Sequence, residues 1–86
     1  MDALHQTLET LLGLARANEP ASVLPVNVLI DRFVAEAGTT PQARFAALEA
    51  LEAAYADAAP QTELGSYARL VIGQRRRLLS LDLPRK

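Results

Sequence analysis

The chain has 86 residues, of which 50% are hydrophobic and 22% are charged, and its formal net charge is −1 at pH 7. A chain of this length forms one small domain that buries only about 60–65% of its unfolded surface, so association with another chain would add stability. The absence of cysteine excludes disulfides and thiolate metal sites. No apolar stretch approaches the roughly 18 residues of a membrane span, and no secretory signal opens the chain, so we expect a soluble cytoplasmic protein.

The charges are distributed unevenly along the chain. Residues 1–63 carry three arginines and nine acids, whereas residues 64–86 carry six bases and one acid. Such a split is expected of a basic surface for an anionic partner, or of a last helix that acidic neighbours neutralise in an antiparallel bundle. We favour the second interpretation, because it needs no partner.

Asp2 is expected to be the N-cap of a first helix over residues 2–17. Apolar residues at helical spacing form one stripe on this helix: Leu4, Leu8, Leu11, Leu12 and Ala15. His5 lies at the edge of the stripe. No cysteine or second histidine could complete a metal or catalytic site with it, so we interpret His5 as a boundary residue.

Two prolines, Pro20 and Pro25, predict a loop over residues 18–25, because proline disfavours helical conformation in the residue before it. Asn27 is then expected to cap a second helix over residues 27–37, although Pro25 could equally open this helix one turn earlier. The sequence therefore leaves two starting points for the second helix.

The second helix is expected to be the most hydrophobic part of the core. Its apolar residues keep the i, i+3, i+4, i+7 spacing: Val26, Leu29, Ile30, Phe33, Val34 and Ala37. Gly38 follows directly and can end the helix, because glycine readily adopts positive φ.

Thr40 and Pro41 predict the start of a third helix over residues 41–58, since the threonine hydroxyl can accept from free amides and proline fixes φ at the first position. Large apolar residues form one stripe on this helix: Phe45, Leu48, Leu51 and Tyr55. Glu52 is expected to project into this stripe, which makes it an isolated charge on an apolar surface.

Thr62 is expected to cap a fourth helix over residues 62–81, and residues 82–86 are expected to form a frayed tail. Apolar residues cover a wide arc of this helix: Leu64, Tyr67, Ala68, Leu70, Val71, Ile72, Leu78, Leu79 and Leu81. Arg75 projects into the arc, where an unpaired cation would be costly. We therefore predict a buried ion pair between Arg75 and Glu52, within the chain or across a dimer.

The four expected helices and their short connections predict an all-α fold. Sequential helices joined by short turns run roughly antiparallel. We therefore expect residues 1–86 to form a single helical domain. It is either an antiparallel bundle or, because the second helix is shorter than the others, an irregular helical array.

No constellation of residues predicts catalysis. The chain has one histidine, no cysteine, no glycine-rich phosphate loop and no Glu-x-x-His pair of the kind that binds bridged metals. Carboxylate pairs such as Glu49 and Glu52 occur at the ordinary spacing of a solvated helix face. We therefore expect no enzymatic activity, no cofactor and no metal.

Two hypotheses of nucleic-acid binding stay open as alternatives. Residues 28–51 have the length of a DNA-binding helix-turn-helix motif, but the helix that would enter the groove is acidic. The basic face of the last helix offers candidate phosphate contacts: Arg69, Arg76, Arg77, Arg85 and Lys86. We take Arg69, Arg76 and Arg77 as candidate anion-binding residues, although that face lacks aromatic residues for base stacking.

The apolar arc of the last helix spans more than half of its circumference, which is wider than one small core requires. We therefore expect a non-enzymatic protein–protein interaction module. A homodimer is the simplest assembly, since two-fold symmetry lets one patch bury its own copy, and an unidentified protein is the other candidate partner. The expected interface residues all lie on this helix: Leu70, Ile72, Arg75, Leu78, Leu79 and Leu81.

Overall fold

The computed structural model describes residues 2–83, which form four α-helices and one turn of 3-10 helix. The α-helices are α1 (Ala3–Ala17), α2 (Val23–Glu36), α3 (Pro41–Ala58) and α4 (Glu63–Ser80), and the 3-10 turn, η1, is Pro20–Ser22. The described part of the chain contains no strand, so the predicted all-α fold of four helices is confirmed. Residues 84–86 of the predicted frayed tail lie outside the described residues.

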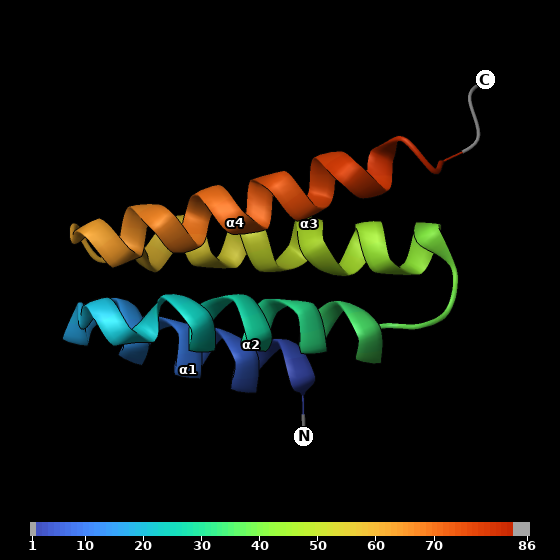
Figure 1. The fold of residues 1–86 in the computed structure, drawn as a ribbon. Helices are drawn as coiled ribbons and strands as arrows, with labels where there is room; N and C mark the ends of the chain where they lie inside the picture. Colours follow the sequence, from blue (N-terminus) through green and yellow to red (C-terminus); the bar gives the residue numbers. More distant parts are fainter. Residues whose placement is uncertain (1, 84–86) are drawn as a thin grey trace.

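The helices are arranged as two antiparallel pairs, one above the other (Figure 1). One pair is formed by α1 and α2, and the other by α3 and α4. The helix α4 packs most extensively against α3 and also contacts α1 and α2. Toward its C-terminal end, α4 rises away from the α1–α2 pair. The last two turns of α4 contain no fully buried residue, since the last buried residue of this helix is Ile72.

The predicted N-caps of α1, α3 and α4 are confirmed. In each case the side chain accepts a hydrogen bond from a backbone N–H of the first turn, at 3.0 Å for Asp2, 3.2 Å for Thr40 and 2.9 Å for Thr62. These bonds satisfy donors that have no partner within the helix. The starts of the three helices that have a capping side chain can therefore be predicted from the sequence.

The start of α2 differs from the predicted range of 27–37 and lies near the alternative start at Pro25. The helix begins at Val23, four residues before the predicted start, and Pro25 lies in its first turn. Proline is tolerated there because the first N–H groups of a helix have no partner within it. Asn27 is thus an interior residue and not an N-cap, which frees its side chain for contacts with α4. Gly38 follows the helix with a φ of +143°, as predicted.

The core is formed by one apolar stripe from each helix. Its fully or almost fully buried side chains are Leu11, Leu12, Ala15, Val26, Ile30, Phe33, Leu48, Leu51, Tyr55, Leu64, Ala68, Val71 and Ile72. The predicted stripes therefore locate the core, although other stripe residues, such as Leu4, Leu29 and Phe45, are only partly buried and three leucines of the predicted arc on α4 are exposed. Burial of a large apolar side chain contributes about 1.5–3 kcal/mol, so these residues supply the main driving force for folding.

Polar contacts join the end of α1 to the start of α4. Asn18 has a φ of 52°, and its Oδ1 accepts a hydrogen bond from the backbone N–H of Leu64 at 2.9 Å. The hydroxyl of Thr62 donates to the carbonyl of Ala15 at 2.7 Å. The C-terminal end of α1 and the N-terminal end of α4 thus satisfy each other's free backbone groups, which fixes the first turn of α4 in the bundle.

Candidate functional site

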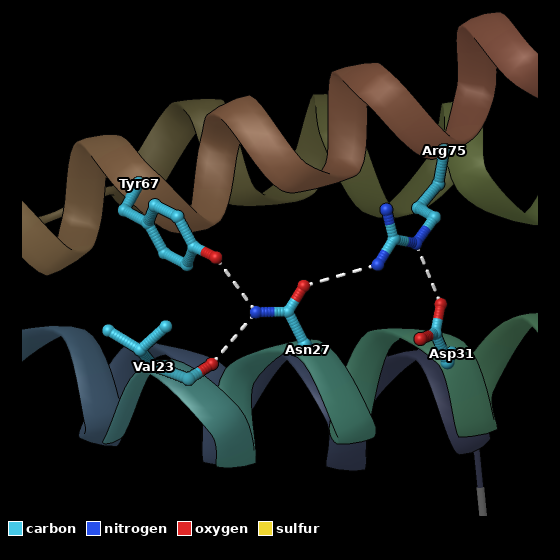
Figure 2. A network of polar contacts seen from close by, with 5 residues as sticks. All are labelled: Val23, Asn27, Asp31, Tyr67 and Arg75. Atoms are coloured by element: carbon cyan, nitrogen blue, oxygen red, sulfur yellow. Dashed lines mark hydrogen bonds and ion pairs between the residues drawn. The ribbon is translucent and has the colours of Figure 1, made fainter. Parts of the chain in front are cut away.

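A polar network crosses the boundary between α2 and α4, which we call the α2–α4 seam (Figure 2). Nδ2 of Asn27 donates to the carbonyl of Val23 and to the hydroxyl of Tyr67, both at 2.9 Å. Nη2 of Arg75 donates to Oδ1 of Asn27 at 3.1 Å, and Nε of Arg75 donates to Oδ1 of Asp31 at 2.8 Å. Asn27 therefore connects Tyr67 to Arg75 through both ends of its amide.

The predicted pair between Arg75 and Glu52 is wrong within the chain. Arg75 pairs with Asp31 on α2, whereas Glu52 pairs with Arg76. The reason is geometric, because consecutive residues of a helix project about 100° apart. Arg75 thus points to the α2 side of α4 and Arg76 to the α3 side. Both pairs retain solvent contact, with side chains 30–56% exposed, so neither is a buried ion pair.

The contact of Glu52 with Arg76 lies between α3 and α4. Nε of Arg76 is 2.8 Å from Oε1 of Glu52, but its N–H is not aligned with that oxygen for a hydrogen bond. The carboxylate lies beside Gly73, where an added Cβ would be in ordinary van der Waals contact with Oε2 of Glu52, at 3.5 Å. The isolated charge predicted on the stripe of α3 is therefore accommodated at the edge of the α3–α4 contact.

Three leucines project from the outer side of α4 and its C-cap, and we call them the α4 leucine row: Leu70, Leu78 and Leu81. Their exposed fractions are 58%, 59% and 71%. Two other predicted interface residues have different environments, because Ile72 is completely buried in the core and Leu79 is partly buried against it. The prediction of Ile72 as an interface residue is therefore wrong, since its side chain points to the inner side of α4.

A shallow groove lies within the α4 leucine row. Its volume is about 370 Å³, and it is lined by Gln74, Arg75, Arg77, Leu78 and Leu81. Four of these residues follow the i, i+3, i+4, i+7 spacing that surrounds one hole on the surface of a helix. Leu78 and Leu81 give the groove apolar walls, and the polar groups of Gln74 and Arg77 border it.

The sequence interpretation missed a second group of exposed apolar residues, on α2. These are Val23, Leu24 and Val28, which are exposed by 42%, 70% and 45%. Leu24 lies in the predicted loop over residues 18–25, and Val28 does not belong to the apolar stripe of the predicted helix. Starting the helix one turn earlier, as Pro25 allowed, places Leu24 and Val28 at i, i+4 on the side away from the core. Among residues 2–83, all large exposed apolar side chains belong to these two groups.

The candidate anion-binding residues surround a second shallow depression, of about 400 Å³. Arg69 and Arg77 are exposed there, whereas Arg76 is engaged by Glu52. Glu52 also lines the depression, and its carboxylate offsets part of the positive charge. The basic face is thus reduced to two arginines without an ion-pair partner among the described residues.

The described residues hold few groups with altered chemistry. His5 is exposed and lies 4.0 Å from Glu9 on the same helix, at the boundary position expected for it. No group of three histidine, cysteine or acidic residues between positions 2 and 83 could hold a metal ion. Burial raises the pKa of the Tyr55 phenol, which donates a hydrogen bond to the carbonyl of Gly65 at 2.9 Å. Tyr55 is therefore a structural residue of the hydrophobic core.

The proposed helix-turn-helix segment, residues 28–51, spans α2 and α3. These helices run in opposite directions in Figure 1 and belong to different pairs. In the DNA-binding motif the two helices cross steeply, at about 90–120°. The observed arrangement is that of a plain helical hairpin.

The fold and surface define the chain as a small all-α domain of four helices with an exposed leucine row on its last helix. No model of a protein family matches it, and neither a curated protein nor a solved structure does. None of the helices that the structure describes combines the length and the apolar character needed to cross a bilayer.

Proposed function

We propose that the chain is a protein–protein interaction module that forms a homodimer through the α4 leucine row. The single observation that carries this proposal is the exposure of Leu70, Leu78 and Leu81, each by more than half, on one side of one helix. The same helix already supplies Leu64, Ala68, Val71 and Ile72 to the core from its other side. The leucine row is therefore not needed to complete the fold.

The energetic argument rests on the apolar area of the row. Removing apolar surface from water contributes about 25 cal/mol per Å², so three leucines that lose most of their exposure supply several kcal/mol toward association. Association also costs translational and rotational freedom, which is why a cluster is needed and a single leucine is insufficient. The row concentrates this area along the last three turns of α4 and its C-cap.

A second copy of the chain is the partner that requires the fewest assumptions. A two-fold axis brings the same patch from both subunits together, so one leucine row covers the other without a further surface. An 86-residue domain also has a small core, and association would raise its stability through mass action. The proposal therefore links the exposed row to the marginal size of the domain.

The test is sedimentation velocity at low and high micromolar concentration, with one disruptive variant and one matched control. Leu81→Asp should shift the chain to a monomer, because a carboxylate cannot be buried unpaired in an apolar contact. Leu24→Asp is the control, since Leu24 has nearly the same exposed fraction as Leu81, 70% against 71%, but lies on α2. A wild-type chain that sediments as a monomer at every concentration would refute the proposal.

Nucleic-acid binding through the basic face is less well supported. Arg76 is paired with Glu52, and the remaining candidates, Arg69 and Arg77, are two of the several cations that such binding needs. The candidates Arg85 and Lys86 lie outside the described residues. No observation on the described surface favours this function over self-association.

A further inference from the structure

The outer side of α4 carries a pattern that is symmetric about Gln74. Leu70 and Leu78 lie four residues before and after it, and Tyr67 and Leu81 lie seven residues before and after it. At about 100° per residue, these five side chains fall within one quarter of the helix circumference. Gln74 is exposed. Tyr67 is half-buried at the edge of the pattern, where its ring packs against the core and its hydroxyl accepts a hydrogen bond from Asn27 of α2.

We propose that two copies of the chain pair through antiparallel α4 helices, with the two-fold axis at Gln74. This inference rests on the proposed function, and it adds the orientation and the register of the two helices. Leu70 of each copy then lies against Leu78 of the other, and Tyr67 lies against Leu81. Every apolar residue of the pattern thereby meets an apolar residue, as a two-fold interface requires.

The groove on α4 supports the same register. Gln74, Arg77, Leu78 and Leu81 surround a hole of the kind that accepts one side chain from a facing helix. The centre of this hole lies between residues 77 and 78. A two-fold axis at Gln74 places residues 70 and 71 of the second copy at that height. Leu70 is the exposed member of those two, and we assign it as the side chain that enters the groove.

The distribution of charge favours antiparallel over parallel pairing. Glu63 begins α4 and Arg77 lies near its end, both on the exposed side. Parallel pairing would set each of them level with its own copy, and like charges that face each other are destabilising. In the antiparallel register, the two Arg77 positions are offset by six residues, or about 9 Å along the helix. The two Glu63 positions are separated much further.

Gln74 provides a reason for one register over its neighbours. On the two-fold axis its amide faces an identical amide, and each can donate one hydrogen bond to the other. A shift of one helical turn would place the amide against a leucine and leave its polar atoms unpaired, which is costly. A single polar residue within an apolar helix contact is known to fix the register in this way.

Single cysteines provide a direct test, because the chain contains none of its own. A disulfide needs Cα atoms within about 7 Å of each other. In the proposed register Gln74 faces its own copy, whereas the two Leu81 positions are offset by 14 residues, or about 21 Å. Under a glutathione redox buffer, Gln74→Cys should form a covalent dimer and Leu81→Cys should not. Gln42→Cys, at an exposed position of α3, is the matched control for disulfides that form by random collision of two chains.

A mixture of two variants tests the register further. Leu70→Cys and Leu78→Cys should cross-link to each other when mixed, and each alone should cross-link far less. Circular dichroism checks that every variant retains its helices. Efficient self-linking of Leu81→Cys, or no linking of Gln74→Cys in a chain that sediments as a dimer, would overturn this arrangement and leave the proposed dimer intact. A chain that sediments as a monomer would overturn both.

Discussion

Nε of Arg75 donates a hydrogen bond to Oδ1 of Asp31 at 2.8 Å, across the α2–α4 seam. The same guanidinium reaches Oδ1 of Asn27 through Nη2. These two partners explain how α4 tolerates an arginine beside its apolar stripe, because the cation is satisfied by α2 and still keeps some contact with solvent. The side chain of Arg75 is 30% exposed and that of Asp31 is 56% exposed, so the ion pair is partly screened by water.

The first prediction concerns this pair and uses double-mutant cycles. Arg75→Ala and Asp31→Ala should show a coupling of about 0.2–1 kcal/mol, the range of partly exposed ion pairs. Arg75→Ala and Glu52→Ala should instead be additive within about 0.5 kcal/mol, because these residues have different partners. Urea unfolding of the singles and doubles measures both values. A larger coupling with Glu52 than with Asp31 would contradict the observed pairing.

The second prediction compares two helical glycines. A Cβ added at Gly65 would approach the carbonyl oxygen of Pro60 more closely than van der Waals contact permits, whereas a Cβ added at Gly13 would meet nothing within 4 Å. Gly13→Ala should therefore stabilise the fold by about 0.5–1 kcal/mol, through the better helix propensity of alanine. Gly65→Ala should destabilise it, since the backbone of Pro60 would have to move. Thermal unfolding of both variants gives the comparison.

The third prediction concerns the buried phenol of Tyr55. Tyr55→Phe removes the hydrogen bond to the carbonyl of Gly65 and should cost about 0.5–1.5 kcal/mol at neutral pH. Burial also raises the pKa of Tyr55 above its ordinary value of 10.0. As the pH rises past that value, the unfolded state releases this proton first and is stabilised, so the free energy of unfolding falls.

The pH profile of Tyr55→Phe provides the control for this effect. The stability difference between wild type and the variant should stay constant below the ordinary pKa of tyrosine and shrink above it, because the variant lacks the titrating group. Denaturant unfolding at several alkaline pH values measures the difference. A difference that does not change with pH would show that Tyr55 does not contribute to the alkaline loss of stability.

The fourth prediction separates the two sides of α4. Ile72 is completely buried, and Ile72→Ala should destabilise the fold by about 2–5 kcal/mol. Leu70 is 58% exposed, and Leu70→Ala should change the stability of the isolated domain by no more than about 0.5 kcal/mol. Leu70→Ala should nevertheless weaken self-association. Unfolding at low protein concentration and sedimentation at high concentration distinguish these effects.

The fifth prediction concerns the basic face. Because Arg76 is paired with Glu52, we expect no binding of duplex or single-stranded nucleic acid at about 0.15 M salt, where exposed charges are strongly screened. Fluorescence anisotropy over a salt series measures binding. Nucleic-acid binding that decreases steeply with salt and is lost in Arg69→Gln and Arg77→Gln would contradict this prediction. It would identify the basic face as the functional surface.

Local signals in the sequence predicted most of the fold. Asp2, Thr40 and Thr62 could be recognised as N-caps because capping depends on one side chain and the next three residues. The sequence leaves two possible starts for α2, since Pro25 is compatible with a loop and with the first turn of a helix. Contacts between helices in the bundle decide between these two starts. The spacing of residues along one helix does not reveal those contacts.

The candidate interface was predicted only in part. Periodicity placed Leu70, Leu78 and Leu81 on α4, but it could not separate them from Ile72, because the apolar arc is wider than the part of α4 that the other helices cover. The partner of Arg75 was missed for a related reason. A helical wheel gives the direction of a side chain relative to its own axis, whereas the identity of the neighbouring helix depends on the packing of all four.

The hydrogen bonds from Thr62 to Ala15 and from Leu64 to Asn18 have a consequence for local motion. They anchor the first turn of α4 at the end of α1, whereas the last turns rise away from the α1–α2 pair (Figure 1). We expect amide hydrogen exchange in α4 to form a gradient, with the amides near Ala68 opening only on global unfolding and those near Leu79 opening by local fraying. Dimerisation would then slow amide hydrogen exchange most in the last turns of α4. Exchange of these amides would therefore report directly on assembly.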